Sequence, residues 1–445
     1  MSGDGKHSLN LEAVAAEFET SFLPHRHVVL AVSGGPDSVA LMHLAAGWKV
    51  SRGGDAPSFS VVTVDHGLRA QSAAEAATVA LAAQALGFPH ATVHWAGGKP
   101  KTGLQAAARE ARYRLIAEHL KGNHWQAFAT GHTQDDQAET LLMRLARGSG
   151  VDGLAAMRRA SPLAGDLCLL RPLLKTSKRD LIAFLRERGL TWIDDPGNLT
   201  VEFERGRLRA ARSALDSIGL VQDHVALSAD RLGRARDALD WTTGYFARAA
   251  GGAMRIDDLG FAEIEWDKLL EFPQEIRLRI LVRLLAAIGG GGSQAVSLGQ
   301  LEAMTIGRGW QSPLGLTLAG TVFSDGTAGR LMMTREYGRS PLPTAEVRPG
   351  QTIKWDHRFT VTSGSAHCET LTVKALGSEG VSYLSKAGCC NFSGPKRATV
   401  SVPGFWRGDT VVAAPLFGYV ADGLGAEGFA CCFAARPFSD FGSCD

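Results

Sequence analysis

The chain has 445 residues, more than one ordinary hydrophobic core accommodates, so we expect two or three domains. With 45% hydrophobic and 21% charged residues, it has the composition of a globular protein, which excludes a largely disordered chain. The net charge is only +2, yet residues 141–215 carry 14 Lys and Arg against 8 Asp and Glu. Such a basic band favours a polyanionic partner that touches one region, although a solvated surface explains the same excess.

The sequence offers no sign of a membrane protein or a secreted one. It contains no apolar stretch of about 18 residues and does not begin with a signal peptide, so we expect a cytoplasmic protein. Of its seven cysteines, all but Cys168 follow residue 360, and none has CxxC spacing. We expect free thiols that pack in the interior; a metal site at Cys389–Cys390 and Cys431–Cys432 is the alternative.

Strand-like and helix-like segments alternate between residues 27 and 148. Short runs rich in β-branched residues predict strands at 27–32, 59–66, 90–95 and 126–132. The segments between them are rich in Ala and Leu at helical spacing. This order is typical of an α/β fold, a parallel sheet with helices on both faces that binds ligands at the carboxyl ends of its strands. The functional loops should therefore follow Val32, Val64 and Thr130.

The rest of the chain predicts two further domains. Residues 172–189 predict an amphipathic helix, and residues 216–290 read as mostly helical up to a run of glycines at 289–292. After Arg339 the pattern changes to alternating strands punctuated by glycine and proline. We therefore predict domains at 1–215, 216–339 and 340–445, the second mostly helical and the third small and β-containing.

The loop Ser33-Gly34-Gly35-Pro36-Asp37-Ser38 joins the first strand to the first helix. Its glycines permit positive φ and close approach of N–H groups to an anion, and Ser38 and the helix N-terminus complete a phosphate cradle. Neither GxxxxGK[ST] nor GxGxxG is present, which argues against Walker-type and dinucleotide sites. Asp37 is the candidate Mg²⁺ ligand beside the phosphates. A tight turn without a ligand is the alternative.

The segment GHTQDDQAET, residues 131–140, combines a histidine with three carboxylates. His132 is expected at a strand end, and Asp135, Asp136 and Glu139 on the first turns of a helix. Carboxylates clustered beside a phosphate site need a cation, either Mg²⁺ or the ammonium of a substrate. Capping of the helix N-terminus by acidic residues is the alternative.

Arginines recur at helical and alternating spacings. Arg109 and Arg112, three apart on a helix, are candidates to neutralise phosphate charge, or else surface residues. Arg205, Arg207 and Arg209 alternate, which predicts an extended segment along an RNA backbone.

These motifs resemble the pyrophosphate-loop ATP enzymes, and more specifically the tRNA(Ile)-lysidine synthetase family. The resemblance rests on SGGPDS followed in order by DHGLR (65–69), AAREARYRLI (107–116), GHTQDDQAETLLMRLARGSG (131–150), RPLL (171–174) and DDPGNLTVEFERGRLR (194–209). The sequence departs from the family at Thr133, where His or Asn is usual, and at Gly206, where Asn is usual. Beyond residue 340 the resemblance is loose.

The resemblance implies an ATP-dependent ligase with Mg²⁺ as cofactor. Such an enzyme adenylates the C2 oxygen of the wobble cytidine in the CAU anticodon of tRNA(Ile), and the ε-amine of free lysine then displaces AMP to form lysidine. The implied domains are an ATP-pyrophosphatase-type catalytic domain at 1–215 and two tRNA-binding parts at 216–339 and 340–445.

The same resemblance assigns site residues. Those implied to bind ATP are Ser33, Gly34, Gly35, Pro36, Asp37, Ser38, Asp65, Arg112 and His132. Those implied to be catalytic are Asp37, Arg109, Asp135, Asp136 and Glu139, and which of the last three is the base for lysine stays open. Those implied to bind tRNA are Arg144, Arg147, Arg205, Arg207 and Arg209.

Two other functions fit part of the pattern. A tRNA thiolation enzyme of the same loop class generally needs reactive cysteines near the nucleotide, and only Cys168 precedes residue 360. A nucleotide-gated RNA-binding protein would not need the carboxylate cluster.

Beyond residue 340, aromatic and basic residues lie on strand-like segments. They favour RNA contacts, although an aromatic core explains them nearly as well. These residues are Trp355, Arg358, Lys396, Arg397, Trp406 and Arg407.

Overall fold

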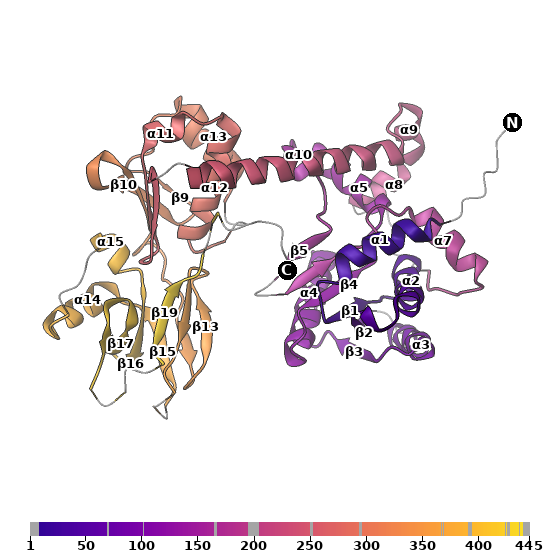
Figure 1. The fold of residues 1–445 in the computed structure, drawn as a ribbon, viewed down its shortest axis with the longest axis horizontal. Coiled ribbons are helices and arrows are strands. Elements are labelled where there is room, and N and C mark those ends of the chain that lie inside the picture. Colours follow the sequence, from indigo (N-terminus) through magenta and orange to yellow (C-terminus); the bar gives the residue numbers. More distant parts are fainter. Residues whose placement is uncertain are drawn as a thin grey trace. The chain divides into compact units, whose positions relative to one another are not determined.

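The protein is represented by a computed structural model. It describes residues 9–68, 71–100, 102–163, 167–194, 204–249, 252–292, 296–365, 367, 369–389, 394–422, 424, 428–435 and 437–438. Arg69 and residues 195–203 of the motifs above lie outside these ranges. The chain forms two compact units, and the division between them falls after Asp237, inside the long helix α10 (Gln222–Ala249) (Figure 1). The boundaries at 215 and 339 stay predictions.

A six-stranded sheet with the order β3-β2-β1-β4-β6-β5 organises the first unit (Figure 1). Its strands are β1 (His27–Ala31), β2 (Ser58–Asp65), β3 (His90–His94), β4 (Ala127–Thr130), β5 (Ala160–Pro162) and β6 (Cys168–Leu170). All neighbours pair in parallel except β5 and β6. The predicted parallel sheet is confirmed, whereas the three-residue strands β5 and β6 were not predicted.

Alternating residues of β1 face two separate cores, so helices cover both faces of the sheet. Val28 and Leu30 pack into a core that includes residues of α1 (Leu11–Phe22), α2 (Pro36–Arg52), α3 (Ser72–Ala85) and α7 (Lys178–Glu187). Val29 belongs to the opposite core, with Ile116 and Leu120 of α4 (Leu104–Gly122). This arrangement confirms the predicted α/β architecture; helix α1 was not predicted.

The second unit begins with helices packed on a five-stranded antiparallel sheet that was not predicted. Its order is β7-β8-β11-β10-β9, from β7 (Met254–Asp257), β8 (Phe261–Ile264), β9 (Thr317–Leu318), β10 (Thr321–Asp325) and β11 (Leu331–Arg335). Helices α11 (Trp266–Leu270), α12 (Gln274–Ile288) and α13 (Leu298–Thr305) contribute to the same core. The middle of the chain therefore has the expected helices and a sheet as well.

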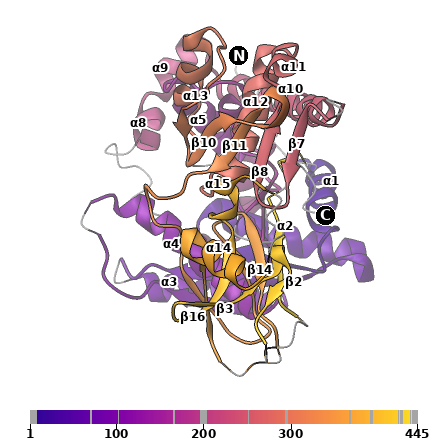
Figure 2. The same ribbon diagram turned by 90° about the vertical axis from the view of Figure 1, so that its left-hand side faces the viewer.

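Two antiparallel sheets follow, in the region where the alternating pattern predicted strands (Figure 2). Their orders are β12-β15-β16-β17-β18 and β13-β14-β19. The strands are β12 (Ala345–Val347), β13 (Thr352–Trp355), β14 (Phe359–Thr362), β15 (Leu371–Ala375), β16 (Pro403–Arg407), β17 (Thr410–Ala414), β18 (Tyr419–Val420) and β19 (Ala430–Phe433). Two helices accompany them, α14 (Gly377–Lys386) and α15 (Lys396–Thr399).

The aromatic and basic residues of this region are mostly interior. Trp355 is 1% exposed, Trp406 is 4% exposed, and Arg358 is fully buried with its Nε donating to Asp356 Oδ2 at 2.7 Å. These three cannot stack on RNA, so the aromatic-core explanation is the correct one for them. Lys396, Arg397 and Arg407 are exposed.

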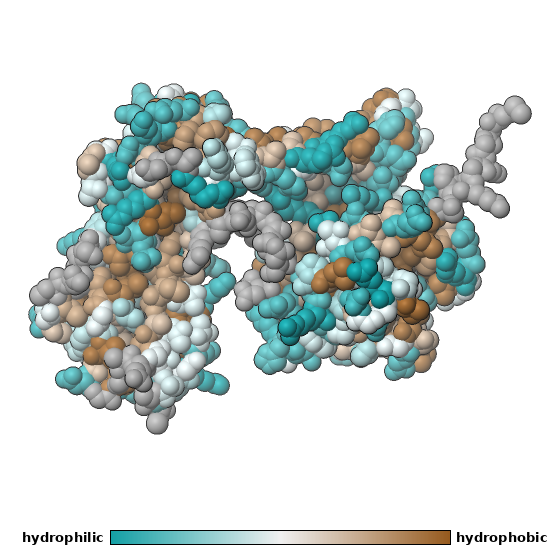
Figure 3. Space-filling view, viewed as in Figure 1, coloured by the Kyte–Doolittle hydropathy of each residue, from teal (hydrophilic) through white to brown (hydrophobic). Residues whose placement is uncertain are grey.

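Hydrophilic residues are spread over the face of the first unit seen in Figure 3. None of the helices in the described ranges combines the length and apolarity needed to cross a bilayer.

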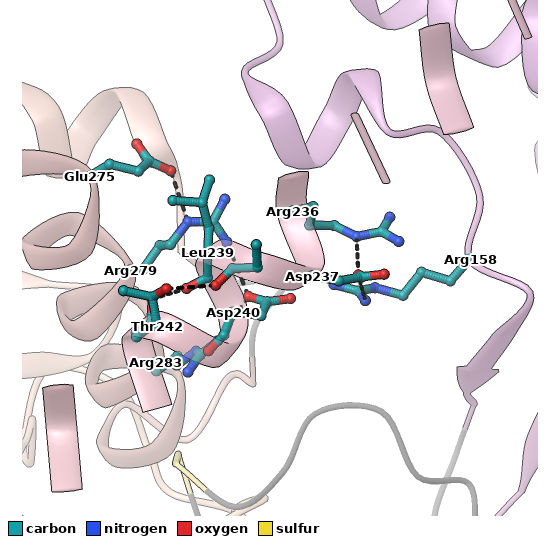
Figure 4. A network of polar contacts seen from close by, with 11 residues as sticks. Arg158, Arg236, Asp237, Leu239, Asp240, Thr242, Glu275, Arg279 and Arg283 are labelled. Atoms are coloured by element: carbon teal, nitrogen blue, oxygen red, sulfur yellow. Dashed lines mark hydrogen bonds and ion pairs between the residues drawn. The ribbon is translucent and has the colours of Figure 1, made fainter. Parts of the chain in front are cut away.

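A buried ion network joins α10 to α12 within the second unit (Figure 4). Asp240 Oδ1 accepts from Arg279 Nη1 at 3.0 Å and from Arg283 Nη2 at 2.8 Å. Arg279 also donates to Glu275 Oε1 at 2.9 Å. Asp240 is thus shared by two guanidinium groups that have little access to water, and Arg279 has Glu275 as a second partner.

We expect Asp240→Ala to lower the free energy of unfolding by about 3–5 kcal/mol, because it removes the shared partner of two buried cations. Urea unfolding followed by circular dichroism measures the loss. The control is Asp230→Ala, which breaks the exposed pair with Arg234 and should cost less than about 1 kcal/mol. Equal effects of the two variants would contradict the structural role of Asp240.

Candidate active site

Three helix N-termini meet at the carboxyl edge of the first sheet. Helix α2 follows β1, α5 (Gln134–Leu145) follows β4, and α7 follows β6. Two contacts join α5 to α7: Gln134 N donates to Thr176 O at 2.9 Å, and Lys178 N donates to Asp135 Oδ2 at 2.7 Å. The strand order also reverses between β1 and β4, which is where open α/β sheets bind their ligands.

The loop from Ser33 to Ser38 is held by its own hydroxyl groups. Ser38 Oγ donates to Gly35 O at 2.9 Å and accepts from Ser33 N at 3.2 Å. Helix α2 begins at Pro36, which has no N–H, and it has no side-chain cap. Ser38 N and Val39 N donate to Gly35 O at 3.1 and 3.0 Å, so among the described residues the Asp37 N–H is the donor of the first turn left for an anion.

The two glycines of the loop differ in their backbone requirement. Gly34 has φ +88°, and a Cβ there would lie 2.4 Å from Ile193 Cδ1, whose backbone N–H donates to Gly34 O at 2.9 Å. Gly35 has φ −69°, so the expectation of positive φ at both positions is wrong for Gly35. At position 34 the side chain of Ile193 leaves no room for a Cβ. At position 35 the nearest atom to an added Cβ would be Ser33 Oγ, at 3.8 Å.

Asp37 lies at the start of α2 with its carboxylate 24% exposed. Oδ2 is 3.5 Å from Lys178 Nζ, while Oδ1 is buried without a hydrogen-bond partner among the described residues. Burial raises the pKa of Asp37 to about 6; Asp136 and Asp135 add to the rise, and Lys178 opposes it. The site thus holds a buried carboxylate oxygen that has no partner among the described residues, and a cation could fill that place.

This arrangement fits Mg²⁺ in the form that accompanies nucleotides. In the ranges that the structure describes, no three acidic, histidine or cysteine residues converge into a metal-ligand set. Mg²⁺ in nucleotide sites commonly takes one or two carboxylates and completes its octahedron with phosphates and water. Asp37, whose buried Oδ1 has no hydrogen-bond partner among the described residues, can supply that carboxylate.

The carboxylates of α5 have distinct partners. Asp136 Oδ2 accepts from Thr133 N at 2.9 Å and so caps its own helix, while Asp135 caps α7 through Lys178 N. The capping explanation is therefore correct in part for both residues. Glu139 is 13% exposed, and its Oε1 accepts from Arg209 Nε at 2.6 Å.

The arginines of residues 205–209 lie on a helix, α8 (Glu204–Ala210), so the predicted extended segment is wrong. Arg205 and Arg209 are four residues apart and share a helix face, which α8 turns toward α5. Arg205 Nη1 lies 3.4 Å from Asp136 Oδ1, and Arg205 Nε lies 3.7 Å from Glu139 Oε2. Arg207 is exposed.

The other two predicted tRNA ligands lie at the end of α5. Arg144 Nη1 donates to the carbonyl oxygens of Gly153 and Ala156, at 2.9 and 3.0 Å, so it holds the turn after α5. Arg147 is exposed and forms an ion pair with Glu204.

Two histidines near the sheet edge are held neutral. His132 Nδ1 lies 2.7 Å from Thr130 Oγ1, and burial lowers the pKa of His132 to about 4, against the opposing effect of Asp136. Burial and then the charge of Arg112 lower the pKa of His66 to about 4, and neither of its ring nitrogens has a hydrogen-bond partner among the described residues. Neutral imidazoles beside a polyanion site can donate or accept without adding charge.

The remaining predicted residues border this edge. Asp65 Oδ1 accepts from Gly67 N at 2.7 Å, and hydrogen bonds from Ser72 and that amide lower the pKa of Asp65. Arg112 is exposed on α4, and Arg109 lies with its guanidinium carbon 5.2 Å from the centre of the Tyr113 ring.

Three contributors were missed by the sequence analysis. Lys178 contacts Asp37, and Arg171 is buried with Nη1 donating to Arg158 O and Ser161 Oγ, both at 2.9 Å. Gly131 follows β4 directly and lies against the backbone of Asp37 and Ser38 at the start of α2. The RPLL motif contains Arg171, whereas nothing local in the sequence links Lys178 to Asp37.

We expect Gly131→Ala to displace the phosphate loop, because its Cβ would lie 2.7 Å from Asp37 O and 3.0 Å from Ser38 N. The ATP concentration for half-maximal thermal stabilisation should rise at least about tenfold, since a displacement near 1 Å costs a preorganised site that much or more. Gly47→Ala is the matched control on α2, where nothing lies within 4 Å of the added Cβ. Unchanged ATP dependence in Gly131→Ala would show that the loop tolerates the shift.

The chain is similar to known proteins over most of its length. Residues 8–213 match the PP-loop domain family. A tRNA(Ile)-lysidine synthase of Bradyrhizobium diazoefficiens is 46% identical over 286 residues, which are 62% of this chain and 76% of the relative. A tRNA(Ile)-lysidine synthase of Ruegeria pomeroyi is 37% identical over 411 residues, covering 91% of each chain. With this similarity added to the site described above, the chain belongs to the tRNA(Ile)-lysidine synthase family.

Proposed function

We propose that the protein joins free lysine to the wobble cytidine of the CAU anticodon of tRNA(Ile), consuming ATP and releasing AMP and pyrophosphate. The observation that carries the proposal is the buried carboxylate oxygen of Asp37 that has no partner among the described residues, beside a helix N-terminus without a side-chain cap and next to the carboxylates of α5. One edge of one sheet thereby offers a place for a polyphosphate and a place for an ammonium. We also propose that the protein acts in the cytoplasm, because its proposed substrates tRNA and ATP are found there.

The chemistry explains why ATP is needed. The C2 oxygen of cytidine is a poor leaving group, so it first attacks the α-phosphorus of ATP and pyrophosphate departs. The lysine amine then attacks C2, and AMP leaves with the former cytidine oxygen. Lysine must lose a proton to attack, so a carboxylate near its amine acts as base.

Residues of the phosphate loop and the strand ends would hold ATP. The Asp37 N–H at the start of α2 would bind the phosphates, and Ser38, whose hydroxyl donates to Gly35 O, would hold the loop in shape around them. The Asp37 carboxylate would hold Mg²⁺, which would supply charge neutralisation for the phosphates. Asp65, His132 and Arg112 border the same edge, and Arg109 would approach the leaving pyrophosphate. His132, as a neutral imidazole, would orient ATP through a hydrogen bond.

The carboxylates of α5 would hold lysine. Glu139 already takes the guanidinium of Arg209, which supports binding of a cationic side chain or amine at this position. Asp135, Asp136 and Glu139 all remain candidates for the base.

Exposed basic residues would bind the tRNA backbone. Arg147 and Arg207 are open to solvent on the first unit, and Lys396, Arg397 and Arg407 are open on the second. Each phosphate contact contributes through counterion release. Arg144 would act indirectly, by fixing the turn after α5.

Pyrophosphate release tests the proposal. We expect release to require the isoleucine tRNA transcript, and adenylated tRNA to accumulate when lysine is omitted. A thiolation enzyme would be indifferent to lysine, and the buried Cys168 gives it no accessible thiol in the described part of the first unit. Absence of pyrophosphate release in the complete mixture would favour a nucleotide-gated RNA-binding protein.

A further inference from the structure

Lys178 is the first residue of α7 and touches both acidic elements of the site. Its Nζ lies 3.5 Å from Asp37 Oδ2, and its backbone N–H donates to Asp135 Oδ2 at 2.7 Å. The hydrophobic face of α7, including Leu181 and Leu185, is buried in the core shared with α2. Packing therefore fixes the start of α7 beside the phosphate loop.

A lysine in this position works against the helix dipole. The N-terminus of a helix carries partial positive charge and favours acidic residues, by about 0.3–1 kcal/mol. The first turn of α7 is already satisfied by Ser177, whose Oγ accepts from Asp180 N at 3.1 Å. Lys178 is therefore unfavourable for the helix dipole and its side chain does not cap the helix. Residues that go against a local structural preference in this way are concentrated at functional positions.

Different cationic side chains contact the carboxylates of α5 and the carboxylate of the phosphate loop. Arg205 and Arg209 contact Asp136 and Glu139 on α5. Lys178 instead faces the carboxylate of the phosphate loop, and its side chain is only 36% exposed. An ammonium at this place lies at the point where an ATP polyphosphate would meet the N-terminus of α2.

We propose that the Lys178 ammonium binds the polyphosphate of ATP and stabilises the pyrophosphate as it leaves. The inference rests on the adenylation proposed above. In that step a bond forms between the cytidine oxygen and the α-phosphorus, the bond from this phosphorus to the bridging oxygen breaks, and the electron pair leaves with pyrophosphate. Lys178 transfers no proton; its charge offsets the charge that grows on the leaving group.

Lys178→Met and Lys178→Arg test the role of the ammonium. Neither change removes the backbone N–H that binds Asp135. The control is Lys175→Met, three residues earlier, where the ammonium pairs with Glu17 Oε1 at 2.7 Å. Two measurements are made on the full chain: the rise in melting temperature against ATP concentration, and the kcat and KM of tRNA-dependent pyrophosphate release.

For Lys178→Met we expect the ATP dependence of melting to shift at least about tenfold and kcat to fall about a hundredfold, with the KM for lysine unchanged, because a charge-assisted contact is lost. Lys178→Arg should recover much of both, and Lys175→Met should match the wild type.

The proposal is overturned if Lys178→Met keeps the ATP dependence and kcat of the wild type. It is also overturned if both Lys178 variants lose activity equally and melt lower without ATP, since that pattern marks a structural ion pair. If the wild type is stabilised by ATP but releases no pyrophosphate, adenylation is refuted, and the melting measurement still decides whether Lys178 binds the nucleotide.

Discussion

Asp37→Asn should reduce tRNA-dependent pyrophosphate release by about a thousandfold or more while the protein stays folded. The substitution removes the charge of the carboxylate that we assign as the Mg²⁺ ligand, whose buried Oδ1 has no other partner among the described residues. Electrostatic contributions of this kind account for several kcal/mol of transition-state stabilisation. Release is measured by a coupled phosphate assay, and folding by circular dichroism. Ser38→Ala is expected to be milder, because it removes a hydroxyl and no charge.

The same variant should be more stable than the wild type in the absence of nucleotide. Burial raises the pKa of Asp37 from 3.8 to about 6, so the folded state holds the proton more tightly than the unfolded state does. The ionised carboxylate therefore costs stability that grows as pH rises from about 4 to about 6, reaching about 3 kcal/mol at pH 7. The stability difference between Asp37→Asn and wild type should vanish below pH 4; a difference independent of pH would contradict the burial of this charge.

The second large effect concerns lysine. Glu139→Gln should raise the KM for lysine about ten- to a hundredfold and leave the KM for ATP within about threefold, because a charged hydrogen bond to the ammonium is lost on α5 and not at the phosphate loop. Steady-state incorporation of labelled lysine at varied lysine and ATP gives both constants.

Glu204→Gln is the matched control, since Glu204 also pairs with an arginine, Arg147, but at the start of α8. It should leave both constants unchanged. If Glu139→Gln moved the two constants together, Glu139 would serve the nucleotide or its metal and the lysine assignment would be wrong.

The parallel sheet and the phosphate loop could be predicted because local sequence determines them. The runs of β-branched residues at 27–32 and 59–66 are apolar on both sides, which is typical of strands buried in a parallel sheet. The alanine-rich segments that follow these runs favour helices. The carboxylates of α5 were found for the same reason, since Asp135 and Asp136 lie on the first turn of the helix that follows β4, and Glu139 lies on its next turn.

Contacts between distant segments could not be predicted. The spacing of Arg205, Arg207 and Arg209 fits an extended chain as well as a helix, and only the pairing with Asp136 and Glu139 distinguishes them. Lys178 is 141 positions from Asp37, and nothing local links the two. In the second unit the five-stranded sheet is made of strands of two to five residues, too short to give a clear period.

Incorporation of labelled lysine into tRNA tests the central claim most directly. The full chain is incubated with ATP, Mg²⁺, labelled lysine and an isoleucine tRNA transcript with the CAU anticodon, beside a transcript that differs only by uridine at the wobble position. We predict label in the CAU transcript, dependent on ATP, and none above background in the uridine transcript. Equal incorporation into both transcripts, or incorporation without ATP, would contradict ligation of lysine to the wobble cytidine.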